Sequence, residues 1–215
     1  MTGPALRNLV QMEGLTPFEE AWEQQRAIHA EVVAGGPSTV LYVEHPSVFT
    51  AGKRTRPEDL PVDGSEVIEV DRGGRITWHG PGQLVAYPIV RLPDPVDVME
   101  FVARLEAAVM RVCTQYGLST VRVAGRTGVW LPAGGGRIER KIAAIGVRVA
   151  RGVTMHGLAL NANPDLDWFT RIVPCGIADA DVTSLSAELD RVVTVAEVAP
   201  ALIAELNASL EGWVE

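Results

Sequence analysis

Two apolar runs separated by one turn dipeptide constrain the fold of this chain more than any other feature. They occupy residues 142–149 and 153–161 of the stretch RKIAAIGVRVARGVTMHGLALNAN, with Arg151-Gly152 between them. Runs rich in apolar and β-branched residues that are joined through a glycine-containing turn predict a β-hairpin. We therefore expect an antiparallel pair of strands in this part of the chain.

Helices are predicted on both sides of this hairpin. Apolar residues recur at three- and four-residue steps over 98–116, which is the spacing of one helical face. An earlier helix is expected to begin with Thr16 as its N-cap, with Glu19 completing a capping box, and to end at Val33. A third helix is expected over 195–210.

Shorter strands are predicted between the helices. They are expected at 39–44, 67–70 and 84–90, and near residues 121 and 129. Helices interspersed with antiparallel hairpins are typical of an α+β fold rather than of a doubly wound parallel sheet. No repeat, low-complexity tract or long linker interrupts the sequence, so we expect a single domain over 1–215.

The overall composition argues against several functional classes. Hydrophobic residues make up 47% of the chain and charged residues 21%, as in ordinary globular proteins. A net charge of −8 argues against a nucleic-acid backbone as the main partner. The first ten residues lack the features of a secretion signal, and no apolar run approaches the ~18 residues of a membrane span. We expect a cytoplasmic protein that binds neither nucleic acid nor membrane.

The two cysteines of the sequence lie in different settings. Cys113 follows Val112 on the apolar face of the helix predicted over 98–116, where a thiol acts as a small hydrophobic filler. Cys175, in the stretch IVPCG, belongs to no periodic face and precedes Gly176, which would let a substrate approach closely. From composition alone, an inert buried thiol and a reactive nucleophile are equally compatible with Cys175.

Few side chains could activate such a thiol. Lys141 lies at the mouth of the first strand of the hairpin, where a lysine is usually a solvated edge charge. His79 and His156 are each followed by glycine, an arrangement found where backbone comes close to a ligand. The other two histidines are expected to be structural or solvent-facing. The separations of His79, His156 and Cys175 match no compact zinc site, and the glycine-rich block lacks the ending of a phosphate loop.

Five blocks of the sequence, in the same order, resemble the lipoyl(octanoyl) transferases, a family of the lipoate and biotin protein ligase superfamily. The blocks are LYVEHPSVFTAGKR (41–54), DRGGRITWHGPGQLVAYPIV (71–90), RKIAAIGVRV (140–149), HGLALN (156–161) and IVPCG (172–176). The glycine-rich block is highly specific as a string, and Lys141 precedes Cys175 by 34 positions (175 − 141). The resemblance covers most of the chain.

The resemblance implies both a fold and an activity. The fold would be a mixed, mainly antiparallel sheet with a smaller second sheet, flanked by helices. The activity would be the transfer of an octanoyl group from octanoyl-acyl carrier protein to a lysine of lipoyl domains. Such domains occur in the E2 subunits of oxo-acid dehydrogenases and in the glycine cleavage H protein. The enzyme would need no cofactor and no metal, and would act as a monomer.

The resemblance also assigns roles to individual residues. By motif match, Cys175 would carry the acyl group as a thioester, and Lys141 would lower the pKa of that thiol. The residues that match the family's substrate contacts are Arg72, Gly73, Gly74, Arg75, Ile76, Thr77, Trp78, His79, Ala144, Ile145, Gly146, His156, Gly157, Leu158 and Ala159. Ile145, Leu158 and Trp78 are expected as walls of an acyl tunnel. A basic rim for acidic partner domains is expected from Lys53, Arg54, Arg56, Arg137, Arg140 and Arg148.

Two other functions fit the same motifs. An ATP-dependent ligase of the lipoate or biotin type would share the fold, because one fold supports both reactions. An acyl-adenylate route needs no protein nucleophile, however, so the pair Cys175 and Lys141 favours the transferase. A non-catalytic protein that binds acyl groups or their carrier is the other alternative, and the same pair argues against it.

Overall fold

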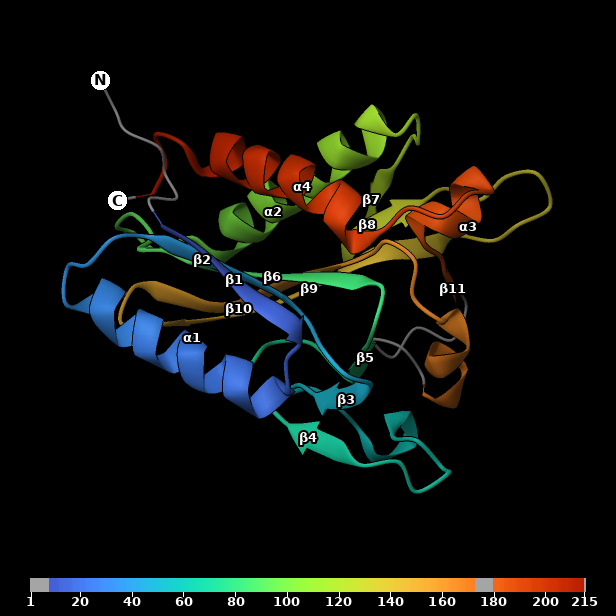
Figure 1. Ribbon diagram of the computed structural model, residues 1–215, viewed down its shortest axis with the longest axis horizontal. Coiled ribbons are helices and arrows are strands. Elements are labelled where there is room, and N and C mark those ends of the chain that lie inside the picture. The colour runs from blue at the N-terminus through green and yellow to red at the C-terminus, as the bar shows by residue number, and fades with distance from the viewer. Residues whose placement is uncertain (1–7, 173–179, 215) are drawn as a thin grey trace.

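The computed structural model describes residues 8–172 and 180–214 and contains two β-sheets (Figure 1). The strands of the larger sheet are, in spatial order, β1 (Asn8–Leu15), β2 (Thr39–Glu44), β6 (Gln83–Ile89), β10 (Val153–Asn161), β9 (Arg140–Ala150), β8 (Arg126–Leu131) and β7 (Val121–Val123). A short strand, β11 (Asp181–Val182), also pairs with β9. The pairs β1–β2 and β9–β11 are parallel and the other pairs of this sheet are antiparallel.

The smaller sheet has the order β4 (Val67–Glu69), β3 (Val48–Ala51) and β5 (Thr77–His79). It follows β2 in the chain through the bend at His45-Pro46 and lies below the large sheet in Figure 1. One turn of 3-10 helix, η1 (Pro57–Asp59), lies in the loop between β3 and β4. A longer one, η2 (Leu166–Arg171), contacts β5.

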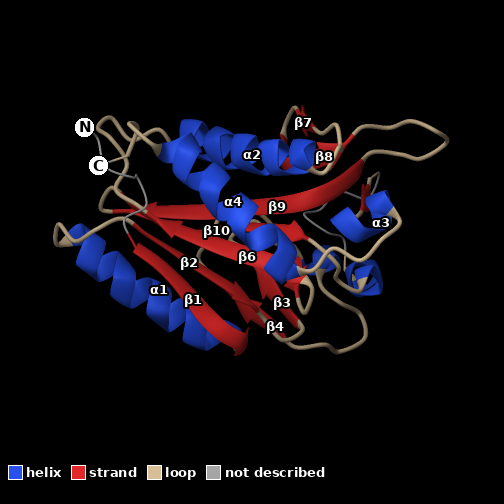
Figure 2. Cartoon of the chain, turned by 45° about the horizontal axis from the view of Figure 1, so that its top comes forward, coloured by secondary structure: helices blue, strands red, loops and turns tan. Residues whose placement is uncertain are grey.

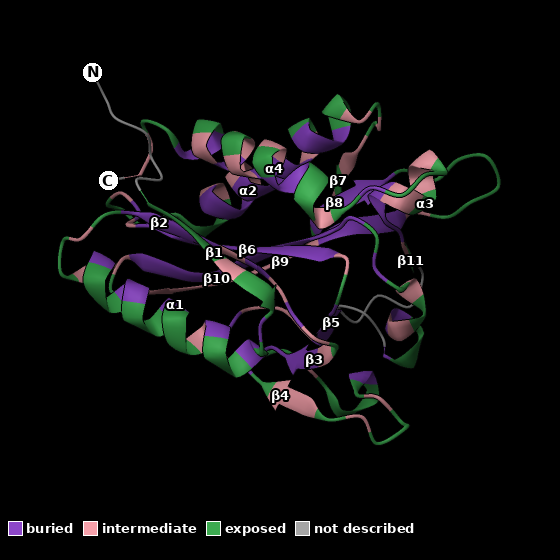
Figure 3. Cartoon of the chain, viewed as in Figure 1, coloured by how far each residue is buried: buried purple, intermediate pink, exposed green. Residues whose placement is uncertain are grey.

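Helices cover both faces of the large sheet (Figure 2). On one face lies α1 (Phe18–Val33), and on the other lie α2 (Val98–Gln115) and α4 (Val195–Leu210), with the short α3 (Leu185–Leu189) between β11 and α4. Because successive side chains of a strand point to opposite faces, each central strand supplies both hydrophobic cores. Val40 of β2 packs toward α2 and α4, whereas its neighbour Leu41 packs toward α1. The buried face of each helix in Figure 3 follows from this arrangement.

A third, smaller core lies between the small sheet and η2. Its buried members are Phe49, Ile76, Trp78, Phe169 and Ile172. Trp78 meets Phe169 edge to face, with ring centroids 5.3 Å apart. The core therefore fixes one face of β5, and the opposite face of this strand is left for other contacts.

The predicted α+β class, the smaller second sheet and the hairpin with its turn at Arg151-Gly152 are confirmed. The helix predicted over 195–210 has these bounds, and the helix predicted over 98–116 ends one residue earlier. No helix in the part of the chain that the structure describes is both long enough and apolar enough to cross a bilayer.

The predicted cap of the first helix is wrong. The helix starts at Phe18, Pro17 stands at the cap position, and no side-chain cap hydrogen bond is formed. Thr16 instead joins the helix to the strand that follows it. Its N–H donates to the carbonyl oxygen of Glu44 at 2.9 Å, and its carbonyl oxygen accepts from Nδ1 of His45 at 2.7 Å.

Candidate active site

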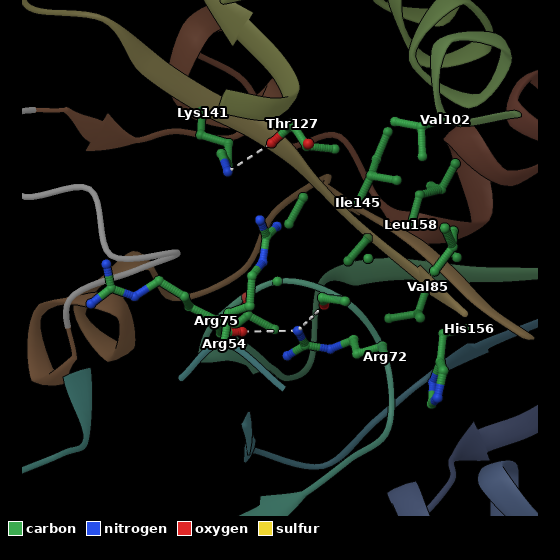
Figure 4. A pocket seen from close by; sticks show the side chains of 18 of the residues that line it. Arg54, Arg72, Arg75, Val85, Val102, Thr127, Lys141, Ile145, His156 and Leu158 are labelled. Carbon is green, nitrogen blue, oxygen red and sulfur yellow. Dashed lines mark hydrogen bonds between the residues drawn. The ribbon is translucent and has the colours of Figure 1, made fainter. Parts of the chain in front are cut away.

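A cavity of about 540 Å³ opens where β9 and β10 meet the small sheet. Its walls come from the loop after β3, the loop before β5, the first turn of α2 and the turn between β7 and β8 (Figure 4). The volume is within the range of sites that hold a small molecule or an extended chain. Residues from four of the five sequence blocks, 41–54, 71–90, 140–149 and 156–161, thus line one cavity.

Most of the residues expected to contact a substrate line this cavity. They are residues 72–75, Thr77, His79, residues 144–146 and residues 156–159, together with Lys141. Ile76 and Trp78 do not line it. Because side chains alternate along β5, Thr77 and His79 face the cavity while Ile76 and Trp78 pack into the third core.

Lys141 is almost completely buried, with 7% of its surface exposed. Its Nζ donates to the carbonyl oxygen of Thr127 at 3.1 Å and lies 4.6 Å from the centroid of the Trp130 ring. Among residues 8–172 and 180–214, no carboxylate forms an ion pair with this nitrogen. The solvated edge charge that is usual for a lysine at a strand end is therefore not what the structure shows.

Arg72 fixes the loop at 72–75, which lines the cavity. Its guanidinium donates to the carbonyl oxygens of Gly73 at 3.1 Å, Arg75 at 2.8 Å and Thr50 at 2.7 Å, and to the Thr50 hydroxyl at 2.9 Å. The N–H of Gly73 donates to the carbonyl oxygen of Val147 at 2.9 Å, which ties the same loop to β9. The loop is thus fixed to both sheets, so the cavity wall is rigid at this point.

Asp71 adds a second link between this loop and the large sheet. Its carboxylate accepts from Nε2 of His156 at 2.7 Å and forms an ion pair with Arg148. Burial opposes ionisation of Asp71, but the hydrogen bond from His156 and the charges nearby outweigh it and lower the pKa of the carboxyl. His156 itself has a φ of 56°, unusual for a residue other than glycine, and its N–H donates to the Gln25 side chain at 2.8 Å.

The histidines at the inner side of the cavity are neutral. Burial lowers the pKa of His79 to about 3, and burial also lowers the pKa of His45 and of His156. The hydrogen-bond network assigns the His79 tautomer. Gln83 donates through its amide nitrogen, so its oxygen accepts from Nδ1 of His79 at 2.6 Å. An imidazole with so low a pKa is a poor base at neutral pH.

Two glycines allow the cavity to form. A Cβ on Gly146 would lie 3.1 Å from both the Arg72 side chain and the carbonyl oxygen of Gly73. A Cβ on Gly157 would lie 2.2 Å from the carbonyl oxygen of Ala86, which belongs to β6. Gly146 and Gly157 are paired across β9 and β10, so the two strands have room for the loop at 72–75 on one side and for β6 on the other.

The expected basic rim is smaller than the sequence suggests. Arg137 and Arg140 both bind the carboxylate of Glu188 at 2.9 Å, and Arg148 is paired with Asp71. Arg54 and Arg56 line the mouth of the cavity. Arg126, which was not anticipated, also lies on the lining.

The structure describes only one of the two cysteines, Cys113. Cys175 and Gly176 lie outside the described residues. Cys113 is fully buried in the core between the large sheet and α2, as predicted, and burial raises the pKa of its thiol to about 12. Cys113 is therefore inert at neutral pH. Across residues 8–172 and 180–214, no cluster of three or more histidine, cysteine or acidic side chains is arranged to hold a metal ion.

Several residues of the site were missed by sequence reasoning, and three of them, Thr127, Trp130 and Val102, show why. Thr127 contributes a backbone carbonyl, and any residue type can do so. Trp130 contacts Lys141 only because the two are paired across β8 and β9. Val102 lines the cavity from a helical face that the sequence marks only as apolar. Of the three, only the apolar period containing Val102 left a signal in the sequence.

The sequence matches the family model described as the lipoyl protein ligase A/B catalytic domain over residues 17–207. An octanoyltransferase of Acidothermus cellulolyticus is 60% identical, with 92% of this chain and 89% of that protein covered. An octanoyltransferase of Nocardia farcinica is 59% identical, with 93% and 80% covered.

Solved structures of the same fold are more distant in sequence. A lipoate–protein ligase A bound with ATP has a TM-score of 0.77 at 19% identity, covering 95% of this chain and 85% of that one. A bipartite lipoate protein ligase of Thermoplasma acidophilum, solved with its E2 lipoyl domain, has a TM-score of 0.70 at 18% identity, covering 97% and 84%. At these identities the structures show the fold alone, and the reaction has to be argued from the site.

Proposed function

The chain belongs to the lipoyl protein ligase A/B catalytic family, and on this premise we propose that it is an octanoyltransferase with a Cys175–Lys141 pair. Its relatives support an acyltransferase that acts in protein lipoylation, with lipoyl domains as acceptors. The proposal adds the donor, octanoyl-acyl carrier protein, the thioester on Cys175, and a lysine of the lipoyl domain as the acceptor group.

The observation that carries the proposal is the setting of Lys141. A lysine that is 7% exposed, lines a cavity and has no carboxylate partner among the described residues is costly to keep unless its charge is used. Buried ionisable groups that line a cavity are candidates for a functional role. A thiolate would supply the missing negative charge.

The described residues on either side of Cys175 support its place beside this lysine. Before it, Ile172 packs in the third core, on the opposite face of β5 from Thr77 and His79. After it, β11 runs parallel to the start of β9, with Val182 paired with Lys141. The described chain therefore ends in the core behind β5 and resumes next to the lysine.

In the first half of the proposed reaction, the Cys175 thiolate attacks the carbonyl carbon of the donor thioester. A free thiol with a pKa of about 8.5 is only a few per cent thiolate at neutral pH, and a neighbouring ammonium increases that fraction. The bond from the carbonyl carbon to the carrier sulfur breaks, and Lys141 gives its proton to the departing thiolate. One thioester replaces another, so the step needs no ATP.

In the second half, the neutral amine of Lys141 takes a proton from the ammonium of the acceptor lysine. The acceptor nitrogen attacks the acyl carbon and releases its second proton to solvent, and Cys175 leaves as a thiolate beside the ammonium of Lys141. An amide forms from a thioester, and the enzyme returns to its starting charge state. One residue thus serves as acid in the first half and as base in the second.

The acyl chain would occupy the apolar part of the cavity. Val85, Val102, Ile145 and Leu158 gather away from the Lys141 nitrogen in Figure 4 and line the same space. Ile145 and Leu158 were expected as tunnel walls, and Val85 and Val102 extend that surface. An octanoyl chain would bury its methylenes here with its carbonyl directed toward Lys141.

Arg54 and Arg56 would receive the acidic donor at the mouth of the cavity. Of the arginines expected at a basic rim, these two line the cavity, whereas Arg137, Arg140 and Arg148 do not. Arg56 also pairs with the exposed Glu58 at 3.6 Å. Complementary charge at such a rim raises the rate of encounter more than the strength of the final complex.

The test is transfer without ATP. Wild-type protein would be mixed with octanoyl-acyl carrier protein and an apo lipoyl domain, and octanoylation of the domain would be followed by mass. We expect transfer in the absence of ATP and no transfer by Cys175→Ser. A strict requirement for ATP and a free acid, with full activity of Cys175→Ser, would show a ligase instead.

A further inference from the structure

Trp130 contacts Lys141 in a way that the proposed reaction does not yet use. The two residues face each other across β8 and β9, next to a register irregularity between Val129 and Trp130. The Lys141 nitrogen lies 4.6 Å from the centroid of the indole, and the Trp130 side chain is 1% exposed. A cation within about 6 Å of an aromatic face is attracted by the ring, and the attraction increases when water is excluded.

The same indole also fixes the other partner of the lysine. Its Nε1–H donates to the carbonyl oxygen of Arg126 at 3.0 Å and so anchors the start of β8. The next residue of that strand is Thr127, whose carbonyl oxygen accepts from the Lys141 nitrogen at 3.1 Å (Figure 4). Trp130 thus acts on Lys141 directly through its face and indirectly through its N–H.

Gly128 makes this approach possible. Its φ is 124°, and a Cβ there would lie 2.5 Å from the carbonyl oxygen of Ala143 and 3.3 Å from Cε of Lys141. Its N–H donates to the buried carboxylate of Glu106 at 3.0 Å. The glycine lets β8 approach the lysine stem closely, and the hydrogen bond to Glu106 holds the strand there.

Both groups that hold the Lys141 nitrogen are uncharged. A carboxylate would bind the ammonium strongly and oppose its loss of a proton, whereas a carbonyl oxygen accepts from either an ammonium or an amine. The ring face favours the ammonium without a formal charge. This environment suits a nitrogen that has to exist in both forms during one cycle.

We propose that Trp130 is a positioning residue whose ring face holds the Lys141 nitrogen at the cavity and favours its ammonium form. The part of this inference that concerns catalysis rests on the proposed function. The contact itself does not, so the two can be tested separately.

The test replaces Trp130 by a series of increasingly fluorinated tryptophans, introduced only at this position. Truncating so buried a ring would leave a void and confuse packing with electrostatics. Fluorine withdraws electron density from the face and nearly preserves the shape and the N–H, so the attraction for a cation weakens stepwise. The matched control places the same series at Trp213, whose ring lies 4.6 Å from the guanidinium of Arg104.

The direct readout is the titration of lysine methylene carbons by NMR. Lys53 and Lys141 are the only lysines of the sequence, so two signals report on the whole protein. We expect the Lys141 midpoint to fall by about one pH unit across the series at position 130. The Lys53 signal and the Trp213 series should not change. An unchanged Lys141 midpoint would overturn the inference.

The second readout is the pH dependence of octanoyl transfer from enzyme to lipoyl domain in a single turnover. Its acid-side midpoint should fall in step with the NMR midpoint. If the NMR midpoint moves and the rate curve does not, the contact exists but Lys141 is not the base of the reaction. That result would count against the proposed function and leave the role of Trp130 toward the lysine intact.

Discussion

Lys141 of β9 is paired with Val182 of β11, and the carbonyl oxygen of Lys141 accepts from the N–H of Thr183 at 2.9 Å. This short parallel pair brings the chain that follows Cys175 back to the lysine. The two residues of the proposed pair are far apart in the sequence. The contact through β11 supports the proposed pair with an observation that does not depend on the family motif.

The buried neutral histidines predict a loss of stability in mild acid. His45, His79 and His156 have pKa values lowered by burial, that of His79 to about 3, whereas an unfolded histidine titrates near 6.5. Below about pH 6.5 the unfolded state binds more protons, so the free energy of unfolding falls as the pH falls. In this pH range each histidine lowers the free energy of unfolding by at most about 1.4 kcal/mol for each unit by which the pH falls.

Urea unfolding between pH 7 and pH 4 measures this effect, and His79→Gln tests the assignment. The variant should be less stable than wild type at pH 7 and should lose stability less steeply as the pH falls. If the free energy of unfolding depends on pH with the same slope in the two proteins, His79 does not contribute to the loss of stability.

Replacing Gly157 or Gly146 by alanine should affect the protein in different ways, the first mainly its stability and the second mainly its transfer rate. Gly157→Ala places a methyl group 2.2 Å from the carbonyl oxygen of Ala86, so β10 has to separate from β6. We expect a loss of about 3 kcal/mol in the free energy of unfolding. Gly146→Ala meets the Arg72 side chain and the carbonyl oxygen of Gly73 at 3.1 Å, a much smaller overlap, so stability should fall by less than about 1 kcal/mol while transfer slows. Equal stability losses in the two variants would contradict this account of the cavity.

Charge reversal at the cavity mouth should weaken use of the donor. We expect the double variant Arg54→Glu, Arg56→Glu to lower kcat/KM for octanoyl-acyl carrier protein by more than about tenfold at low ionic strength. The difference should shrink as salt screens the charges. Arg151→Glu makes the same type of change in the turn between β9 and β10, off the cavity lining, and should have little effect. Equal losses at the two places would indicate an effect of net charge alone.

Cys113 should be silent in the reaction. Its thiol has a pKa raised to about 12 by burial, so native protein at pH 7 should be alkylated at Cys175 alone, and Cys113 should react only in denaturant. Cys113→Ala should cost about 1 kcal/mol of stability and keep transfer within about twofold of wild type. Alkylation of native Cys175→Ser would show that Cys113 is accessible.

The strongest local patterns of the sequence predicted the elements that form the frame of the site. The hairpin of β9 and β10 and the helix α4 were predictable because periodicity, length and turn residues agreed. β1 was not, because most of its residues are exposed and its sequence NLVQMEGL shows no alternation. Its place is set by parallel pairing with β2, an interaction between distant segments that has no local signature.

The site was predictable as a set of segments and not as a set of side chains. A motif names consecutive residues such as 76–79, whereas the pleat of β5 sends Thr77 and His79 to the cavity and Ile76 and Trp78 to a core. The contact of Trp130 with Lys141 depends on the register of β8 and β9, which includes an irregularity. Register of this kind is fixed by packing in three dimensions, so the sequence alone did not reveal the contact.

The most direct test of the Cys175–Lys141 pair is the intact mass of the enzyme during a single turnover, compared between wild type, Lys141→Arg and Cys175→Ser. Arginine keeps a positive charge beside the thiol but does not act as a base. Wild type should gain one octanoyl mass and lose it to the lipoyl domain. Lys141→Arg should gain the mass and pass it on at least about a hundredfold more slowly, and Cys175→Ser should gain none. Rapid discharge from Lys141→Arg, or transfer by Cys175→Ser, would contradict the account.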